Sequence, residues 1–107
     1  MKQKRVIFID TANRTVSETT VATLDDMQKL VGGLIERATV LENGDELYVN
    51  EEGFFDSNPQ LFFIDGAHQW FAGNAYIIGS VTDSGNNRPA KSTIGEIVKK
   101  VNFGGRI

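Results

Sequence analysis

Three neighbouring residues of this sequence, His68, Trp70 and Phe71, have side chains of the kinds that active sites and binding sites use. His68 is the single histidine, and an imidazole can act as a general base near neutral pH. However, no serine or cysteine stands at a recognisable nucleophile elbow, so the sequence supplies no nucleophile–base pair. We therefore interpret His68 as a loop or half-buried histidine, and a hydrolase that uses it is the least favoured function.

The sequence offers little for binding a metal ion. With no cysteine and one histidine, it lacks the three or four nitrogen or sulfur ligands of a zinc site. Glu51, Glu52, Asp56 and Asp65 could supply oxygen ligands to Ca²⁺ or Mg²⁺. Their spacing matches no calcium loop, so solvated acids around a turn are the simpler interpretation. We expect no bound metal.

No pattern in the sequence indicates a cofactor or a catalytic centre. The glycines lack the spacing of a phosphate-binding loop and precede no helix that begins with Lys-Ser or Lys-Thr. Two carboxylates could in principle hydrolyse a glycoside, but a chain of 107 residues leaves little room for a substrate cleft. We expect no cofactor and no catalytic residues, and thus a protein that is not an enzyme.

Charge is distributed unevenly along the chain. The net charge is −3, yet thirteen of the fourteen acidic residues lie within residues 10–83, which contain only three bases. Lysine and arginine are what replace counterions on a phosphate backbone, so we do not expect nucleic acid as a direct ligand. An acidic surface would instead attract a basic protein partner.

The apolar segments are short. Val6 to Ile9 and Leu61 to Ile64 are the longest runs, far below the length of a membrane span. The first residues lead directly into a strand-like run without the apolar region of a signal peptide. We expect a cytoplasmic protein that does not contact a membrane.

Local signals predict α+β architecture. Thr23 with Asp26 and Thr93 with Glu96 have the spacing of helix capping boxes, and Asn43-Gly44 is a strong hairpin signal. Because strands are grouped rather than alternating with helices, we expect one small, mostly antiparallel sheet with two main helices packed on it. One domain spans 1–107, with a core of about 4–101 and a short flexible C-terminal tail. The predicted strands are 6–9, 14–21, 35–42, 46–50 and 76–81, with an apolar segment at 61–64, and the helices are 24–31 and 94–101.

Aromatic residues gather in one segment, since seven of the ten lie within residues 54–76. Adjacent pairs such as Phe54-Phe55 and Phe62-Phe63 cannot point to the same side of a strand. Either this segment is buried on both faces, or some rings point outward and form an interface or a stacking pocket.

Three ordered blocks of the sequence resemble a known family. They are Val31-Gly32-Gly33-Leu34-Ile35-Glu36, Leu47 to Gly53, and Phe71 to Gly79. With the predicted helix before the first block, the chain follows the family's pattern from about residue 24 to 80. They are similar to the domain of unknown function numbered 3846, found in small proteins of phages, plasmids and other mobile elements. The segment from Asp56 to Trp70 departs from the family by its many aromatics. The resemblance implies an accessory protein in a bacterial host cell and supplies no activity or catalytic residue.

Three functions follow from these observations. In the first, a non-enzymatic protein of a phage or mobile element binds a host macromolecule through an acidic, aromatic-bearing face, and an inhibitor of a host defence system is one form of it. In the second, the protein sequesters a nucleotide-like small molecule, with Trp70 or Phe71 stacking and Arg37 or Arg88 meeting phosphate. The third is the hydrolase. A homodimer through an unpaired sheet edge is compatible with all three. The residues expected to bind the partner or ligand are Arg37, Asn50, Glu51, Glu52, His68, Trp70, Phe71 and Asn74.

Overall fold

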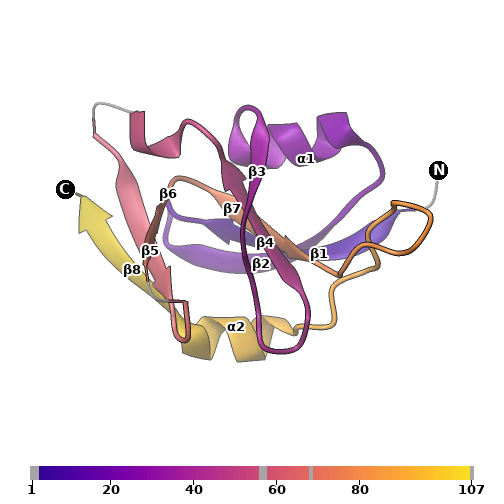
Figure 1. The fold of residues 1–107 in the computed structure, drawn as a ribbon. Helices are drawn as coiled ribbons and strands as arrows, with labels where there is room; N and C mark the ends of the chain where they lie inside the picture. Colours follow the sequence, from indigo (N-terminus) through magenta and orange to yellow (C-terminus); the bar gives the residue numbers. More distant parts are fainter. Residues whose placement is uncertain (1–2, 56–57, 68, 107) are drawn as a thin grey trace.

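The computed structural model describes residues 3–55, 58–67 and 69–106, and within these ranges the chain forms eight strands and two α-helices (Figure 1). His68 and Asp56 therefore lie outside the described residues. The elements are β1 (Lys4–Asp10), β2 (Thr15–Val21), α1 (Leu24–Val31), β3 (Ile35–Val40), β4 (Glu46–Asn50), a 3-10 turn η1 (Gly53–Phe55), β5 (Gln60–Ile64), β6 (Trp70–Ala72), β7 (Ala75–Ile78), α2 (Ile94–Lys100) and β8 (Val101–Arg106).

Five strands form the larger sheet, in the order β2-β1-β7-β4-β3, and every neighbouring pair is antiparallel. The hairpin β3–β4 turns where Asn43-Gly44 predicts it, with Gly44 at a positive φ of 92°. The α+β class and the mostly antiparallel pairing are confirmed. The molecule is mostly sheet.

Helix α1 begins at the predicted capping box. The Thr23 side chain accepts a hydrogen bond from the backbone N–H of Asp26, whose carboxylate accepts from the N–H groups of Thr23 and Ala22. The backbone hydrogen bonds from Ala22 and Thr23 lower the pKa of Asp26 below its usual value. The helix ends at Gly32, which adopts the left-handed conformation.

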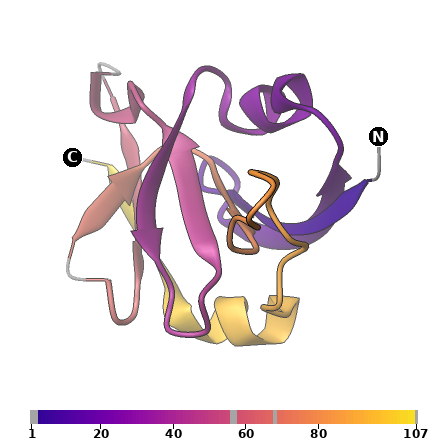
Figure 2. The ribbon, with the colours of Figure 1, turned by 45° about the vertical axis from the view of Figure 1, so that its right-hand side comes forward.

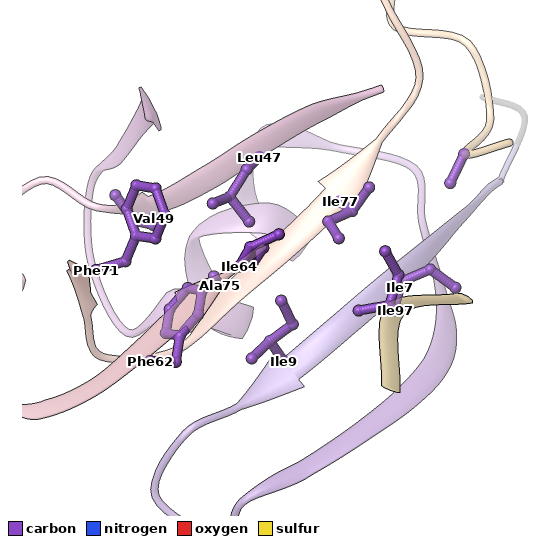
Figure 3. Packing of buried hydrophobic residues seen from close by; sticks show 11 residues of the cluster. Ile7, Ile9, Leu47, Val49, Phe62, Ile64, Phe71, Ala75, Ile77 and Ile97 are labelled. Atoms are coloured by element: carbon purple, nitrogen blue, oxygen red, sulfur yellow. The ribbon is translucent and has the colours of Figure 1, made fainter. Parts of the chain in front are cut away.

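The two faces of the five-stranded sheet bury separate clusters. Val6, Tyr76 and Ile78 lie in one cluster together with Val31 of α1. Their chain neighbours Ile7 and Ile77 belong to the other cluster, as the alternation of side chains along a strand requires. This second cluster draws Phe62, Ile64 and Phe71 from the smaller sheet and Ile97 from α2, and Figure 3 shows its side chains pointing toward one another. In Figures 1 and 2 the strands lie between the two helices.

The smaller sheet corrects two predictions. Strands β6, β5 and β8 form a separate three-stranded antiparallel sheet, where we expected a single sheet. The C-terminal residues, expected to be a flexible tail, form β8 and pair along β5 from Ile64↔Val101 to Gln60↔Arg106. The physical reason is that β8 becomes a strand by pairing with β5, which lies far upstream in the sequence. Local patterns in a glycine-containing tail do not report such a distant pairing.

Gly79 allows a close backbone approach at the end of β7. A Cβ on this residue would come within 2.6 Å of the carbonyl oxygen of Arg88 and would also collide with that of Pro89. Only glycine therefore lets the segment at Arg88 and Pro89 lie against the end of β7. Neither of the helices in the described ranges has the length and apolar composition needed to cross a bilayer.

Candidate functional site

A pocket of about 260 Å³ lies where the β3–β4 hairpin, η1 and β6 meet. Around it, acidic and aromatic side chains from three separate segments reach the surface. We call this surface the acidic aromatic face. It consists of Glu36, Glu51, Glu52, Phe54, Phe55 and Trp70, of which Glu36, Glu51, Phe54 and Trp70 line the pocket itself.

The rings of the acidic aromatic face are turned outward. Phe55 is 84% exposed, Phe54 is 57% exposed and Trp70 is 46% exposed. Glu36, Glu51 and Glu52 are exposed as well. Large apolar side chains exposed side by side mark interaction surfaces more often than single ones do. Of the two alternatives for the aromatic segment, the structure therefore assigns these rings to the surface and Phe62 and Phe71 to the core.

Trp70 is held in place from within the smaller sheet. Its ring lies 5.5 Å from that of Phe63, measured between ring centroids, and the two residues are direct partners across β5 and β6. The six-membered part of the indole lies over Gly104 of β8, where a Cβ would overlap it. The indole is therefore braced on one side while nearly half of the residue's surface stays accessible to solvent.

The acidic turn after β4 is fixed by Asn50. Its amide Nδ2 donates to the carbonyl oxygen of Val31 at 3.1 Å, and its Oδ1 accepts from the N–H of Glu52 at 2.8 Å. The N–H of Glu51 donates to the carbonyl oxygen of Leu34 at 3.0 Å. Asn50 thus connects the end of α1 to this turn and leaves the two glutamate side chains facing solvent.

The 3-10 turn that carries the two phenylalanines needs a glycine at its start. A Cβ on Gly53 would lie 2.6 Å from the carbonyl oxygen of Ala72 in β6. Because Gly53 has no side chain, η1 can lie directly against β6. This contact places Phe54 in the lining of the same pocket as Trp70.

Five of the eight predicted binding residues line this one pocket: Arg37, Asn50, Glu51, Trp70 and Phe71. Glu52 follows Glu51 in the same turn. Asn74 lies in another pocket and accepts a hydrogen bond from the N–H of Thr11 at 2.9 Å. The eighth residue, His68, is outside the described residues.

Of the residues predicted to bind a nucleotide-like ligand, Trp70 stays exposed in the pocket, whereas Phe71, Arg37 and Arg88 make contacts within the fold. Phe71 is 3% exposed and packs on Phe62, with 5.3 Å between ring centroids. Arg37 contacts the carboxylate of Glu46 at 3.4 Å. Arg88 donates to the hydroxyl of Ser80 at 2.9 Å, and it is not among the residues that line the pocket.

The acids considered for a cation do not converge in the part of the chain that the structure describes. In those residues, no three histidine, aspartate or glutamate side chains are grouped around a common point. Asp65 instead accepts a hydrogen bond from Asn102 at 3.1 Å. Asp56 falls outside the described ranges.

Two contributors to this face, Glu36 and Gly104, are not among the binding residues that the sequence predicts: Glu36 belongs to a predicted strand and Gly104 to the expected C-terminal tail. Phe54 belongs to the aromatic pair for which the sequence leaves core and interface open. The signal for Phe54 is the aromatic pair at 54–55, whereas Glu36 carries none, because its neighbours Ile35 and Arg37 are half-buried and exposed and the strand does not alternate there. For Gly104 no local signal existed, since its importance depends on the position of Trp70 in a distant strand.

Comparison with known proteins gives one match. A family model described as Domain of unknown function (DUF3846) matches residues 1–101. No curated protein and no solved structure matches the chain. The family description carries no activity, so any function has to be argued from the site.

Proposed function

The chain belongs to the DUF3846 family, and we propose that it is a non-enzymatic binding protein whose acidic aromatic face binds a basic surface of a protein partner. In the form that the family resemblance suggests, it is an accessory protein of a phage or mobile element in a bacterial cytoplasm. Its partner is then a host protein, and inhibition of a host defence system is one outcome of the binding.

The observation that carries this proposal is the convergence of exposed acids and exposed aromatic rings around one pocket. Aromatic side chains dominate the binding energy of many protein interfaces, where they insert into pockets of the partner. Trp70 and Phe54 meet the requirement of exposed, pocket-lining anchors. Glu36, Glu51 and Glu52 surround them with negative charge.

The charge selects the class of partner. Three carboxylates close together repel a phosphate backbone, whereas lysine and arginine side chains are attracted to them. Such complementarity accelerates encounter and suppresses wrong partners more than it adds affinity. The expected complex is therefore sensitive to salt, because at 0.1 M ionic strength salt largely screens interactions between exposed charges more than about 10 Å apart.

The test compares three forms of the chain immobilised on a support. They are the unmodified chain, a triple variant Glu51→Lys/Glu52→Lys/Trp70→Ala, and a control triple variant Val40→Ala/Glu42→Lys/Asp83→Lys. The control makes the same kinds of change at exposed residues outside the pocket. Proteins retained from a bacterial lysate by the unmodified chain are then purified, and their Kd values for all three forms are measured.

We expect a purified basic protein to bind the control as tightly as the unmodified chain and the triple variant at least about tenfold more weakly, since loss of one anchoring aromatic costs 2 kcal/mol or more. Circular dichroism has to show the same fold for all three forms. Equal affinity of the triple variant and the unmodified chain for every retained protein would refute the proposal.

A further inference from the structure

A second and larger pocket, of about 490 Å³, lies on the α1 side of the five-stranded sheet. It is bounded by the end of β2 and the start of α1, by β3 and β4, and by the loop at residues 85–87. Small-molecule sites in proteins occupy about 300–1,000 Å³ and combine apolar walls with a few polar groups. The lining residues are Lys4, Val21, Ala22, Leu24, Met27, Ile35, Tyr48, Gly85, Asn86 and Asn87.

The walls of this pocket have that composition. Val21, Met27 and Ile35 supply apolar surface and Tyr48 supplies an aromatic ring. The polar groups come from the amides of Asn86 and Asn87 and from the ammonium group of Lys4. Among the described residues that line the pocket, Lys4 carries the only charge.

The aromatic wall is rigid. Tyr48 stacks on Tyr76 with 5.3 Å between ring centroids and an angle of 6° between the ring planes. Its hydroxyl donates to Oε1 of Glu46 at 2.9 Å, so the ring is fixed at both its face and its tip. Tyr76 itself is fully buried, and its hydroxyl has no hydrogen-bond partner among the described residues.

The carboxylate of Glu46 lies near the pocket but is not part of its lining. Its carboxylate is buried and is contacted by Tyr48, by Arg37 at 3.4 Å and by Nδ2 of Asn87 at 3.4 Å. Asn87 also donates to the carbonyl oxygen of Gly79 at 2.7 Å, which holds the loop against the sheet. The lining therefore presents a positive charge to a ligand, and the adjacent carboxylate is compensated within the fold.

We propose that this pocket binds a small, flat aromatic molecule with one anionic group. The ring lies against Tyr48 between the apolar walls, the amide of Asn86 and the Oδ1 oxygen of Asn87 meet its polar edge, and Lys4 meets the anion. A nucleoside monophosphate and an aromatic carboxylate both have this chemistry. This site is separate from the acidic aromatic face, since the two pockets share no lining residue.

The test follows backbone amide signals of the isotope-labelled chain by nuclear magnetic resonance. The ligands added are the four common nucleoside monophosphates, two aromatic carboxylates without a ribose (4-hydroxybenzoate and indole-3-acetate), and uncharged adenosine. We expect shifts at residues 21–27, 48 and 85–87. We also expect adenosine to bind at least about tenfold more weakly than its monophosphate, because it lacks the anionic group that Lys4 meets.

Three variants test whether the charge of Lys4 itself binds the ligand. Lys4→Gln should weaken the anionic ligand about tenfold or more, and Lys99→Gln, the same charge change on α2, should leave the affinity unchanged. Trp70→Ala should also leave it unchanged, so failure of this site and failure of the protein-binding face are distinguishable. Binding of nucleotides alone or of carboxylates alone supports the proposal and identifies the source of the ligand.

Three results would overturn it. The first is the absence of shifts with every anionic compound at about 1 mM, which excludes even weak binding. The second is a set of shifts that maps away from residues 21–27, 48 and 85–87. The third is an affinity that Lys4→Gln does not change while circular dichroism shows an intact fold.

Discussion

The indole ring of Trp70 lies directly over the backbone of Gly104, in a strand 34 positions further along the chain, with no room for a Cβ between them. Phe63 contacts the same indole within the smaller sheet. One glycine thereby sets the orientation of the main anchor of the acidic aromatic face.

Gly104→Ala should displace the indole without unfolding the chain. The added Cβ overlaps the six-membered ring, so the side chain has to rotate away from β8. We expect a shift in the emission of Trp70, the single tryptophan, and a loss of partner binding comparable to that of Trp70→Ala.

Gly95→Ala serves as the control for that change. A Cβ on Gly95, within α2, would lie 4.0 Å from Oγ1 of Thr93, which is an ordinary van der Waals distance. Alanine there should leave Trp70 emission unchanged and stabilise the chain by about 0.5–1 kcal/mol in denaturant titration, because glycine is costly inside a helix. Unchanged emission in Gly104→Ala would show that Gly104 does not position the indole.

The negative charge around Trp70 can be measured through its fluorescence. Glu36 and Glu51 line the same pocket as Trp70, so they should attract cations to the indole and repel anions. Relative to free N-acetyltryptophanamide at equal, low ionic strength, caesium ions should therefore quench the emission more efficiently than iodide ions do. Glu51→Lys/Glu52→Lys should reverse this order, whereas Glu42→Lys/Asp83→Lys should preserve it. Equal relative quenching by both ions in the unmodified chain would contradict an acidic environment.

Asp45 is a buried carboxylate that ties the β3–β4 turn to the segment before α2. It is 0% exposed and accepts hydrogen bonds from the backbone N–H of Ser92 at 2.8 Å, from the Ser92 hydroxyl at 2.7 Å and from the N–H of Lys91 at 2.9 Å. Asp45→Ala leaves these donors without an acceptor, so we expect a loss of about 3 kcal/mol in the free energy of unfolding. Chemical denaturation measures it, with Asp83→Ala in the exposed loop expected to change stability by less than about 0.5 kcal/mol.

The two tyrosines should resist ionisation in alkaline solution. Burial raises the pKa of Tyr76, with further contributions from Tyr48 and Glu46, and burial together with the hydrogen bond to Glu46 raises the pKa of Tyr48. In the unfolded chain both groups lose their protons near their ordinary pKa of 10.0, whereas the folded chain retains them. Stability contributed by these groups is thus complete below pH 10 and falls as the pH rises above it.

The absorbance of tyrosinate measures this directly, because Tyr48 and Tyr76 are the only tyrosines in the chain. We expect the tyrosinate signal to appear at higher pH than in urea-unfolded chain, and to rise together with the loss of the circular dichroism signal. Titration of both tyrosines near pH 10 in a folded chain would contradict the buried stacked pair.

Much of the larger sheet could be predicted because its signals are local. The capping residues Thr23 and Asp26 and the turn at Asn43-Gly44 act over three or four positions, and both helices and the β3–β4 hairpin lie where these signals place them. The smaller sheet could not be predicted in the same way. Strand β6 has only three residues, and the sequence of β8 contains two glycines, so neither segment has a local strand signal. Both become strands because they pair with β5.

The two candidate sites also differ in how far the sequence predicts them. Glu51, Trp70 and Phe71 were identified by residue type, and the fold places them around one pocket. The pocket beside Tyr48 could not be found from sequence, since Lys4, Tyr48 and Asn87 come from three distant segments without a shared motif. Residue type alone also does not reveal that Arg37 is engaged by Glu46.

The pairing of β1 with β7 has a kinetic consequence. Strand β1 can form its hairpin with β2 early, because Asp10 and Thr15 face each other across a short turn. Its other edge stays open until Ala75–Ile78 arrives opposite Ile7 and Ile9. Chains that depend on such distant pairings fold in milliseconds to seconds rather than microseconds. During that interval an apolar strand with free N–H and C=O groups is exposed, and this early hairpin is therefore the segment most prone to pair with another chain.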